Sequence, residues 1–559
     1  MSPLDEATEL HNQGRLADAE RLYRAILATD PNQPDALALL GVLLASRKEY
    51  AQATPLLEKA IQSDPSASLF HFYLGNIFLD MGKDERAETS FRAALALQPN
   101  FANAHFRLAL LLEKQNKFSE ALQHLRKTTE REPKFAAAWV KLSELSFKID
   151  DYELAKNSAE MALRQTPNDL AAHVALALAL DSLDKEEDAV APLKKAIQLK
   201  PDFVEAWDML ASTYQKLNKL DEADKTFHKS IEIAGCALKY EDSRDVAEVE
   251  YGIQHWNLAI LELLRGDFRH GFAHYRARFK KIGRNQRLSF PRPIWNGEDL
   301  QGKKILIVGE QGFGDVLMLC RFAPFLKAKG ARVVLLAHRP LAKLLKAANI
   351  ADEIICEAPS AQGDFDYQTS IFDLPFWLDT KIETIPDKVY LPSPRPDAST
   401  KLPRGKLPKI GVVWAGKKEF GNDRRRSIPL SVFASVLTLK NVQFFNLTRD
   451  LRPGDADILA KHSVVDLSSL LNDFYATAQF MAQMDLIITC DTATAHLAGG
   501  MGKNVWTLLP FAPDWRWLTE REDSPWYASM WLFRQNKKAD WAGVIARVRA
   551  ELARFIAKK

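Results

Sequence analysis

The sequence has few cysteines, no strong charge of either sign and no long apolar run. Its four cysteines among 559 residues form no CxxC pair, so neither a disulfide framework nor a structural zinc site is indicated. The 75 Lys and Arg nearly balance the 72 Asp and Glu, and a net charge of +3 argues against nucleic-acid binding. No apolar stretch approaches the roughly 18 residues of a membrane span. We therefore expect a cytoplasmic protein without nucleic-acid or integral membrane contacts.

A column of prolines recurs through the first part of the chain at intervals of 34 residues, with small residues in phase. The three columns are Pro31, Pro65, Pro99, Pro133, Pro167 and Pro201; Ala19, Ala53, Ala87, Ala121, Ala155, Ala189 and Ala223; and Gly41, Gly75, Ala109, Ser143, Ala177 and Ala211. Prolines end helices and small residues let two helices approach, so each period predicts a helical hairpin. The pattern resembles the tetratricopeptide repeat over residues 1–235. His71, His105 and His173 share one large packing position of this repeat, which predicts structural histidines.

Stacked repeats of this kind curve and present a concave groove formed by the first helix of each hairpin. One residue of each first helix is expected to face it, in a mixed apolar and basic strip of Leu39, Tyr73, Arg107, Lys141, Ala175 and Met209. We expect Tyr73, Arg107 and Lys141 to dock an extended protein segment. The alternative is an array used only for homo-oligomerisation or as a spacer.

The repeat spacing stops after residue 235, and the sequence then changes its period. Short β-rich runs alternate with amphipathic stretches from residue 304 and again from residue 409, which predicts parallel sheets with crossover helices. The expected fold is an α-helical solenoid followed by an α/β domain with two Rossmann-like lobes facing a cleft. The predicted segments are the solenoid (1–235), a capping hairpin and linker (236–303), an N-terminal lobe (304–395), a C-terminal lobe (396–540) and a terminal helix (541–559).

The strands and helices of the two lobes can be placed from the apolar runs. The predicted strands are 304–309, 332–337, 353–356, a short one near 367, 409–416, 442–447, 485–489 and 505–509. The predicted helices are 315–329, 340–348, 473–484 and one from about 494. In open α/β sheets ligands bind at the carboxyl ends of the strands, so the segments that follow them hold the candidate site residues.

The segment GEQGFGDVL, residues 309–317, lies between a buried strand and a helix. Gly312 and Gly314 permit close backbone approach and positive φ, the helix N-terminus can receive an anion, and Asp315 lies at its mouth. The glycine spacing is not GxGxxG and the segment lacks the lysine of a P-loop. Dinucleotide binding and ATP hydrolysis are therefore not expected.

Two further segments follow strands of the second lobe. Asp491 and Thr492 begin a helix whose free amides suit a diphosphate, and His496 lies one turn further on; the alternative is two helix caps and a packed histidine. Three arginines at 424–426 either neutralise phosphates or form a solvated face. Three tryptophans within 510–527 either line a sugar or base pocket or anchor the loop.

Four motifs in order, GEQGFGDVL, WAGKKEFGNDRRRSIPL, DTATAHLAGGMGKNVWTLLP and PDWRWLTEREDSPWY, resemble the carboxyl-terminal domain of tetratricopeptide-repeat glycosyltransferases. That domain is similar to the family 9 heptosyltransferases of lipopolysaccharide synthesis, which have the two-lobed GT-B fold. The resemblance covers roughly residues 255–555. It implies a nucleotide-sugar co-substrate, no bound metal and no other cofactor.

The resemblance also implies roles for single residues. Asp315 matches the proposed general base of the heptosyltransferases, and Arg426 stands where that family usually has lysine on the donor diphosphate. The family's DTG is here Asp491-Thr492-Ala493, which restricts backbone approach to the donor. The glycine loop, the arginine run and the resemblance together predict the donor-binding residues Gly312, Gly314, Arg425, Arg426, Asp491, Thr492 and His496.

These observations predict a metal-independent glycosyltransferase whose repeats dock a protein acceptor, such as flagellin or another surface protein, for transfer to a Ser or Thr hydroxyl. A long peptide-binding solenoid is not required for a saccharide acceptor. Two alternatives stay open: a heptosyltransferase-like enzyme acting on a saccharide or lipid, and a non-catalytic repeat scaffold with a relic GT-B domain.

Overall fold

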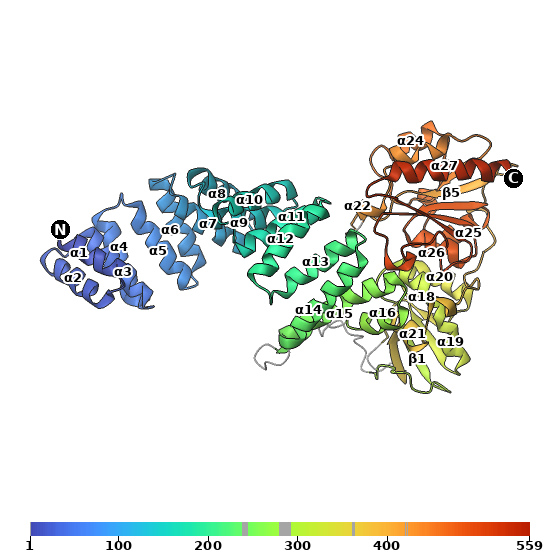
Figure 1. Ribbon diagram of the computed structural model, residues 1–559, viewed down its shortest axis with the longest axis horizontal. Coiled ribbons are helices and arrows are strands. Elements are labelled where there is room, and N and C mark those ends of the chain that lie inside the picture. Colours follow the sequence, from blue (N-terminus) through green and yellow to red (C-terminus); the bar gives the residue numbers. More distant parts are fainter. Residues whose placement is uncertain (1, 238–243, 279–291, 360–363, 420, 422) are drawn as a thin grey trace. The chain divides into compact units, whose positions relative to one another are not determined.

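The computed structural model describes residues 2–237, 244–278, 292–359, 364–419, 421 and 423–559 (Figure 1). The chain forms two compact units, residues 1–206 and 207–559. No helix in these described ranges is long and apolar enough to cross a membrane. Much of the predicted linker, residues 282–291, lies outside them.

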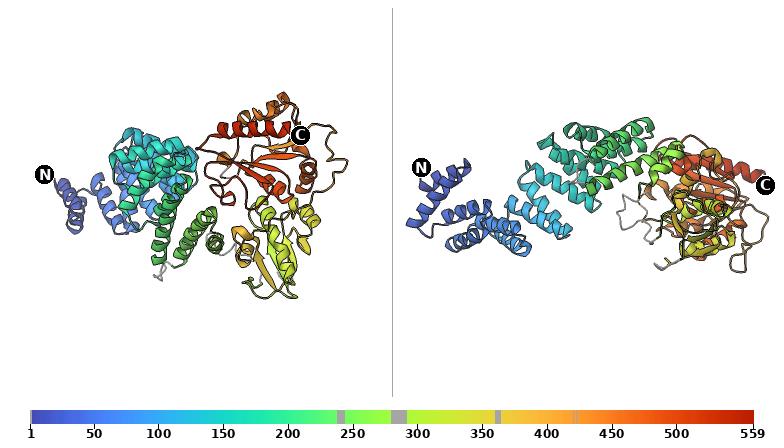
Figure 2. Two further views of the ribbon diagram at one scale, coloured as in Figure 1. Left: turned by 45° about the vertical axis from the view of Figure 1, so that its right-hand side comes forward. Right: turned by 90° about the horizontal axis from the view of Figure 1, so that it is seen from below.

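Unit 1 is a stack of helical hairpins, which the right-hand view of Figure 2 shows as successive pairs. Each repeat proline in Pro31–Pro201 lies two residues beyond the end of a second helix, as its missing N–H requires. The helices are α1 (Pro3–Asn12), α2 (Leu16–Thr29), α3 (Pro34–Ser46), α4 (Tyr50–Ser63), α5 (Ser68–Asp80), α6 (Asp84–Leu97), α7 (Ala102–Lys114), α8 (Phe118–Arg131), α9 (Ala136–Lys148), α10 (Tyr152–Gln165), α11 (Leu170–Ser182) and α12 (Glu186–Leu199). The same pattern continues in α13 (Val204–Lys216) and α14 (Leu220–Ala237).

The small-residue columns lie between the two helices of each pair. The seven column alanines are fully buried. A Cβ added to Gly75 would lie 2.6 Å from the Phe91 ring, and one added to Gly41 would lie 3.1 Å from Leu57 Cγ. The predicted close approach of the paired helices is therefore confirmed.

A further column, which the sequence analysis missed, sits in the turn within each hairpin. Its members all have a left-handed φ of 57° to 76° and recur every 34 residues: Gly14, Lys48, Gly82, Asn116, Asp150, Asp184 and Asn218. Asn and Asp tolerate this conformation better than most residues. The varied residue types hide the column in the sequence.

Two of the three repeat histidines, His105 and His173, bond the backbone of their own repeat. His105 Nε2 lies 2.9 Å from the Pro99 carbonyl oxygen, and His173 Nε2 lies 3.0 Å from that of Pro167. The indole N–H of Trp139 donates to the carbonyl of its own repeat proline in the same way. This large side chain therefore fixes the turn before its helix, as its repeat position predicts.

Unit 2 begins within α13, continues through α14 and a hairpin of α15 (Arg244–Arg265) and α16 (Phe268–Tyr275), and ends in two lobes. The first lobe has a four-stranded parallel sheet in the order β3-β2-β1-β4. Its strands are β1 (Lys304–Val308), β2 (Arg332–Leu336), β3 (Glu353–Ile355) and β4 (Tyr367–Ser370). Its helices are α18 (Phe313–Leu319), α19 (Ala323–Ala328), α20 (Arg339–Ala348) and α21 (Leu374–Trp377).

The second lobe has a six-stranded parallel sheet in the order β10-β9-β8-β5-β6-β7. Numbered within the lobe, this is the 3-2-1-4-5-6 order of doubly wound nucleotide-binding sheets. Its strands are β5 (Lys409–Val413), β6 (Gln443–Asn446), β7 (Val465–Asp466), β8 (Leu486–Cys490), β9 (Val505–Leu509) and β10 (Met530–Arg534). Its helices are α22 (Asp423–Arg426), α23 (Leu430–Phe433), α24 (Asp455–Lys461), α25 (Phe474–Ala482), α26 (Ala493–Gly500) and α27 (Trp541–Ala557).

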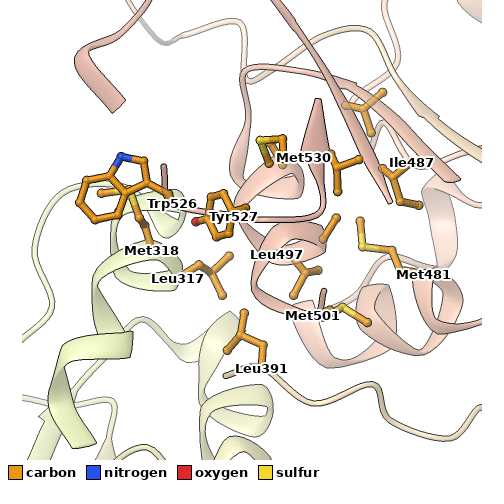
Figure 3. Packing of buried hydrophobic residues seen from close by; sticks show 14 of the residues in the cluster. Leu317, Met318, Leu391, Met481, Ile487, Leu497, Met501, Trp526, Tyr527 and Met530 are labelled. Atoms are coloured by element: carbon orange, nitrogen blue, oxygen red, sulfur yellow. The ribbon is translucent and has the colours of Figure 1, made fainter. Parts of the chain in front are cut away.

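The two lobes and the α15–α16 hairpin share one hydrophobic core. Figure 3 shows Leu317 and Met318 of the first lobe beside Leu497, Trp526 and Tyr527 of the second. The hairpin joins this core through Phe268, whose ring centroid is 5.5 Å from that of Trp526, and through Phe272, 5.8 Å from Trp515. The hairpin predicted as a cap is thus part of the α/β unit.

Some predicted elements differ in extent. The helix predicted over 315–329 is broken by a 3-10 turn at Cys320–Phe322. Pro324 in the first turn of α19 explains the break, because it cannot donate to the preceding turn. The strands β7 and β10 and the helices α21, α22, α23 and α24 were not predicted.

Candidate functional site

The sequence-predicted residues of the α/β unit follow the strands at which the order of each sheet reverses. In the first sheet that point lies between β1 and β4, and in the second it lies between β5 and β8. Gly312, Gly314 and Asp315 follow β1, the arginines of α22 follow β5, and Asp491 with Thr492 follows β8. Such switch points leave a crevice at the carboxyl ends of the strands, where doubly wound sheets bind ligands.

The Asp315 carboxylate is held from two sides. The Gly312 N–H, at the N-cap position of α18, donates to its Oδ2 over 2.8 Å. Its Oδ1 forms an ion pair with the Arg516 guanidinium of the second lobe. The turn before it is built on Gln311, with φ of +64°, while Gly312 has an ordinary φ of −85°. The expected positive φ therefore falls on Gln311 and not on the glycines.

Arg516 links two carboxylates and lies in the 3-10 turn Trp515–Trp517. It pairs with Asp514 over 2.6 Å as well as with Asp315, and its side chain is only 10% exposed. Burial by itself would lower the pKa of Arg516, but the two carboxylates raise it above its usual value. Arg516 therefore stays charged at the meeting point of the lobes.

Asp491 completes a cluster of charges beside Arg516. Burial, followed by the nearby charge of Asp514, raises the pKa of Asp491 to about 6, although Arg426 and Arg516 oppose the shift. We call Asp315, Asp491, Asp514, Arg426 and Arg516 the interlobe cluster. Its carboxylates can exchange protons and its guanidinium groups can bind an anion.

The arginines of α22 differ in their surroundings. Arg426 lies against the backbone at Gly416, because a Cβ added there would be 2.6 Å from a guanidinium nitrogen of Arg426. The Nε of Arg426 lies 3.8 Å from Oδ1 of Asp423. Arg425 beside it is half-buried, and Arg424 is exposed. Asp423 is itself buried and pairs with Arg452. The three arginines are therefore partly packed against the second lobe and do not simply form a solvated face.

Gly314 and His496 lie where α18 meets α26. A Cβ added to Gly314 would be 2.8 Å from His496 Cδ2, so the missing side chain lets the two helices pack. His496 is 4% exposed, its Nδ1 lies 2.9 Å from the Tyr527 hydroxyl, and its ring stacks on Trp517 with centroids 5.1 Å apart. Burial lowers the pKa of His496 well below its usual value. These contacts make both residues part of the packing between the lobes.

Thr492 occupies the N-cap position of α26 but makes no side-chain capping bond. Its hydroxyl lies 3.2 Å from that of Thr489 instead. The first amides of α26 consequently have no capping side chain, which suits the binding of an anion at this helix end.

Several residues of the site were missed in the sequence. Arg278 is buried and donates to Glu310 over 2.6 Å and to Asp373 over 3.0 Å, while the Tyr275 hydroxyl bonds the side chain of Gln311. These bonds tie the end of α16 to the loops that follow β1 and β4. Burial raises the pKa of Tyr275 to about 12. Glu310 was the signal available in the sequence. A charged residue directly after a buried strand needs a partner of opposite charge, and this predicts a cation such as Arg278 nearby.

The tryptophans of 510–527 are anchors of the loop. Trp515, Trp517 and Trp526 are 2%, 0% and 1% exposed. Their burial leaves no open ring face for a sugar or a base. Among the described residues, no group of three or more His, Cys, Asp and Glu is placed to hold a metal ion.

In unit 1, only part of the predicted groove strip comes together. Leu39 and Tyr73 line a pocket of about 440 Å³ between the first helices of three successive hairpins. We call it the α1–α3–α5 pocket; its lining is Leu4, Asp5, Thr8, Glu9, Asn12, Asp35, Ala38, Leu39, Leu69, Phe70 and Tyr73. Arg107 is exposed on α7, and Lys141 on α9 pairs with Glu144 over 2.6 Å. Neither lines this pocket, whose charged residues are acidic.

Comparison with known proteins identifies the repeats. Tetratricopeptide repeat models match residues 4–68, 72–134, 106–155 and 141–202, and a second such model matches 204–235. The N-terminal part of the chain therefore consists of tetratricopeptide repeats, as predicted. The chain is 28% identical over 341 residues to Protein FlbA of Caulobacter vibrioides, covering 54% of each protein. It thus spans about half the length of this curated relative.

Solved structures similar to this chain include the tetratricopeptide protein YrrB, described as having an unusual peptide-binding site, at 19% identity and a TM-score of 0.31. This match covers 32% of the present chain and 91% of YrrB. Pseudomonas aeruginosa PilF matches at 17% identity and a TM-score of 0.35, covering 38% of this chain and 96% of PilF.

Proposed function

We propose that this protein is a glycosyltransferase that moves a sugar from a nucleotide-sugar donor to a protein hydroxyl, with a GT-B arrangement of its two lobes. The observation that carries the proposal is the contact of Asp315 with Arg516. This contact places the loop that follows β1, at the switch point of the first sheet, beside Arg516 of the second lobe. A hydroxyl acceptor and an anionic donor can therefore be held at one place.

The donor diphosphate would bind in the second lobe. Arg426 and Arg516 supply positive charge, and the amides at the start of α26 supply donors. Arg425 lies next to Arg426 and adds charge to the same loop. As the bond to the sugar breaks, negative charge grows on the leaving diphosphate, which these groups stabilise.

The acceptor hydroxyl must lose its proton as it attacks the anomeric carbon of the sugar. Asp315 is the residue in position to take it, because the Gly312 N–H fixes its orientation at the mouth of α18. Arg516 would shift from Asp315 toward the diphosphate when donor binds, which frees Oδ1 for the hydroxyl. His496 is packed between the lobes and has no part in this step.

The acceptor would be a protein docked by the tetratricopeptide repeats, with Ser or Thr as the modified residue. Such repeats are protein-interaction modules whose curvature creates extended binding surfaces. The α1–α3–α5 pocket, with Tyr73 in its lining, provides a concave place for a side chain of that protein.

A second candidate function is a non-catalytic scaffold. The contacts on both Asp315 oxygens favour it, because they compete with an acceptor hydroxyl for the carboxylate. In that case the Asp315–Arg516 pair would serve only to hold the lobes together.

Donor binding distinguishes the two functions. We would measure the thermal shift of the full chain with UDP, GDP, ADP and CMP sugars, for the wild type, Arg426→Ala and the matched control Arg424→Ala on the exposed side of α22. The glycosyltransferase account expects a selective shift that Arg426→Ala abolishes and Arg424→Ala retains. Absence of a shift with every donor would favour the scaffold.

A further inference from the structure

We infer that the α1–α3–α5 pocket binds a protein segment in which an apolar side chain is flanked by lysine or arginine. The inference deepens the acceptor docking proposed above, and it rests on that proposal where it identifies the partner as the substrate. The sequence strip was expected to be apolar and basic, whereas the lining of this pocket is apolar and acidic. The partner chemistry is accordingly the opposite of what the strip suggested.

The floor of the pocket is apolar and partly open to solvent. Leu69 is 42% exposed, and Leu39 and Tyr73 are half-buried beside the buried Phe70. Tyr73 brings a phenol hydroxyl to the lining of the pocket. An apolar side chain of a partner would remove this surface from water, and the hydroxyl could bond its backbone.

The rim of the pocket carries three exposed carboxylates, Asp5 and Glu9 on α1 and Asp35 on α3. In the described ranges none of them is ion-paired with a lysine or arginine. Asp5 is engaged in the capping box of α1 with Ser2, and Glu9 accepts a bond from Gln13. Glu9 and Asp35 are thus the carboxylates best placed to meet a cation from outside.

The charge of the rim selects among possible partners. An acidic or phosphorylated segment would be repelled, and a wholly apolar one would strip water from carboxylates without replacing it. A segment with cations beside its apolar residue satisfies both parts of the lining. The volume of about 440 Å³ accommodates a few side chains and not a folded domain, so the occupant is an extended or loop segment.

Fluorescence anisotropy of the full chain tests this. The probe is a short labelled Gly/Ser peptide with a central Lys-Leu-Arg-Phe-Lys, and the control peptides replace either its basic residues by Glu or its apolar residues by Ser. The double variant Glu9→Lys with Asp35→Lys should weaken binding of the probe about tenfold or more. The matched control, Glu130→Lys with Glu187→Lys, changes the net charge equally at exposed sites outside the pocket and should bind within about twofold of the wild type.

Tyr73→Ala should also weaken binding, because it removes part of the floor without changing charge. Both control peptides should bind more weakly than the probe, and added salt should reduce the affinity of the probe. Equal melting curves for the double variants and the wild type exclude unfolding as the cause. Equal affinity of the two double variants, equal binding of the Glu peptide, or no binding of the probe to the wild type would overturn the inference.

Donor-induced thermal shifts on the same samples separate this inference from the proposed function. A donor shift without probe binding would overturn the pocket assignment alone. Probe binding that depends on Glu9 and Asp35, without any donor shift, would support the pocket assignment while contradicting glycosyl transfer.

Discussion

Asp315 and Arg516 lie 201 positions apart in the chain, yet their side chains form an ion pair that joins the two lobes of unit 2. The same arginine pairs with Asp514, so it bonds one carboxylate from each lobe. Because Asp315 is also fixed by the Gly312 N–H, the first lobe presents this carboxylate in a defined orientation.

Replacing Arg516 by alanine should destabilise unit 2 by about 3 kcal/mol, because the largely buried Asp315 and the partly buried Asp514 lose their common partner. Tryptophan fluorescence during urea unfolding reports this unit, since Trp139 is the only one of the 12 tryptophans before residue 207. Arg521→Ala is the control: its partner Asp523 is 69% exposed, and the expected cost is about 1 kcal/mol or less. Equal losses in the two variants would contradict a structural role of the interlobe pair.

Gly314→Ala should cost about 1–3 kcal/mol of unit 2 stability, although alanine is the better helix former. The added Cβ would meet His496 at 2.8 Å, and this ring is fixed by Trp517 and Tyr527. Gly405→Ala is a matched control, because a Cβ there meets nothing within 4 Å. A variant Gly314→Ala as stable as Gly405→Ala would show that the helices can separate at no cost.

Asp491→Asn should stabilise unit 2, and the gain should grow as the pH rises from about 4 to about 7. Burial and Asp514 raise the pKa of Asp491 from 3.8 to about 6, so the folded state binds its proton more tightly than the unfolded state. Rising pH therefore removes stability from the wild type across this range, and asparagine cannot titrate. Urea unfolding at pH 5 and pH 8 measures the difference; a gain that is larger at pH 5 would contradict the assignment.

Unit 1 should lose stability as the pH falls from about 6.5 to about 4. His124 Nδ1 lies 2.7 Å from His105 Nδ1, and burial together with His105 lowers the pKa of His124 to about 4. The unfolded chain then binds the proton more tightly, at a cost of up to about 3 kcal/mol. Far-UV circular dichroism during unfolding should show this loss, and His124→Gln should flatten it; an unchanged pH slope in the variant would exclude this histidine pair as the cause.

The repeat unit was largely predictable from sequence because its packing is local. Each hairpin buries its alanine column within 34 residues, so spacing alone locates helices, turns and structural histidines. The groove chemistry was less predictable, since Tyr73 comes to line one pocket with Asp5 and Glu9 of α1 only once three hairpins have stacked. The left-handed turn column was missed because Gly, Lys, Asn and Asp all occupy it.

The long strands of the α/β unit were predicted to within a few residues, because parallel buried strands are continuous apolar runs. The two-residue strand β7 is too short to give such a signal. The candidate site was predicted only where its residues follow strands, as Asp315 and Asp491 do. Arg516 and Arg278 were missed because Asp315 and Asp373, which they bond, lie far away in the sequence, and no local pattern marks a charge whose neighbour comes from a distant segment.

Release of nucleoside diphosphate from the donor tests the central claim most directly, because it requires no knowledge of the acceptor. With the nucleotide sugar that gives the thermal shift, the wild type should hydrolyse donor slowly, with water in place of the acceptor hydroxyl. Asp315→Asn should bind the donor as tightly as the wild type does. Its rate of product release should fall to about one hundredth of the wild-type rate or lower, as expected on loss of a general base. Equal rates for the two proteins, or no release by either, would contradict a catalytic role for Asp315.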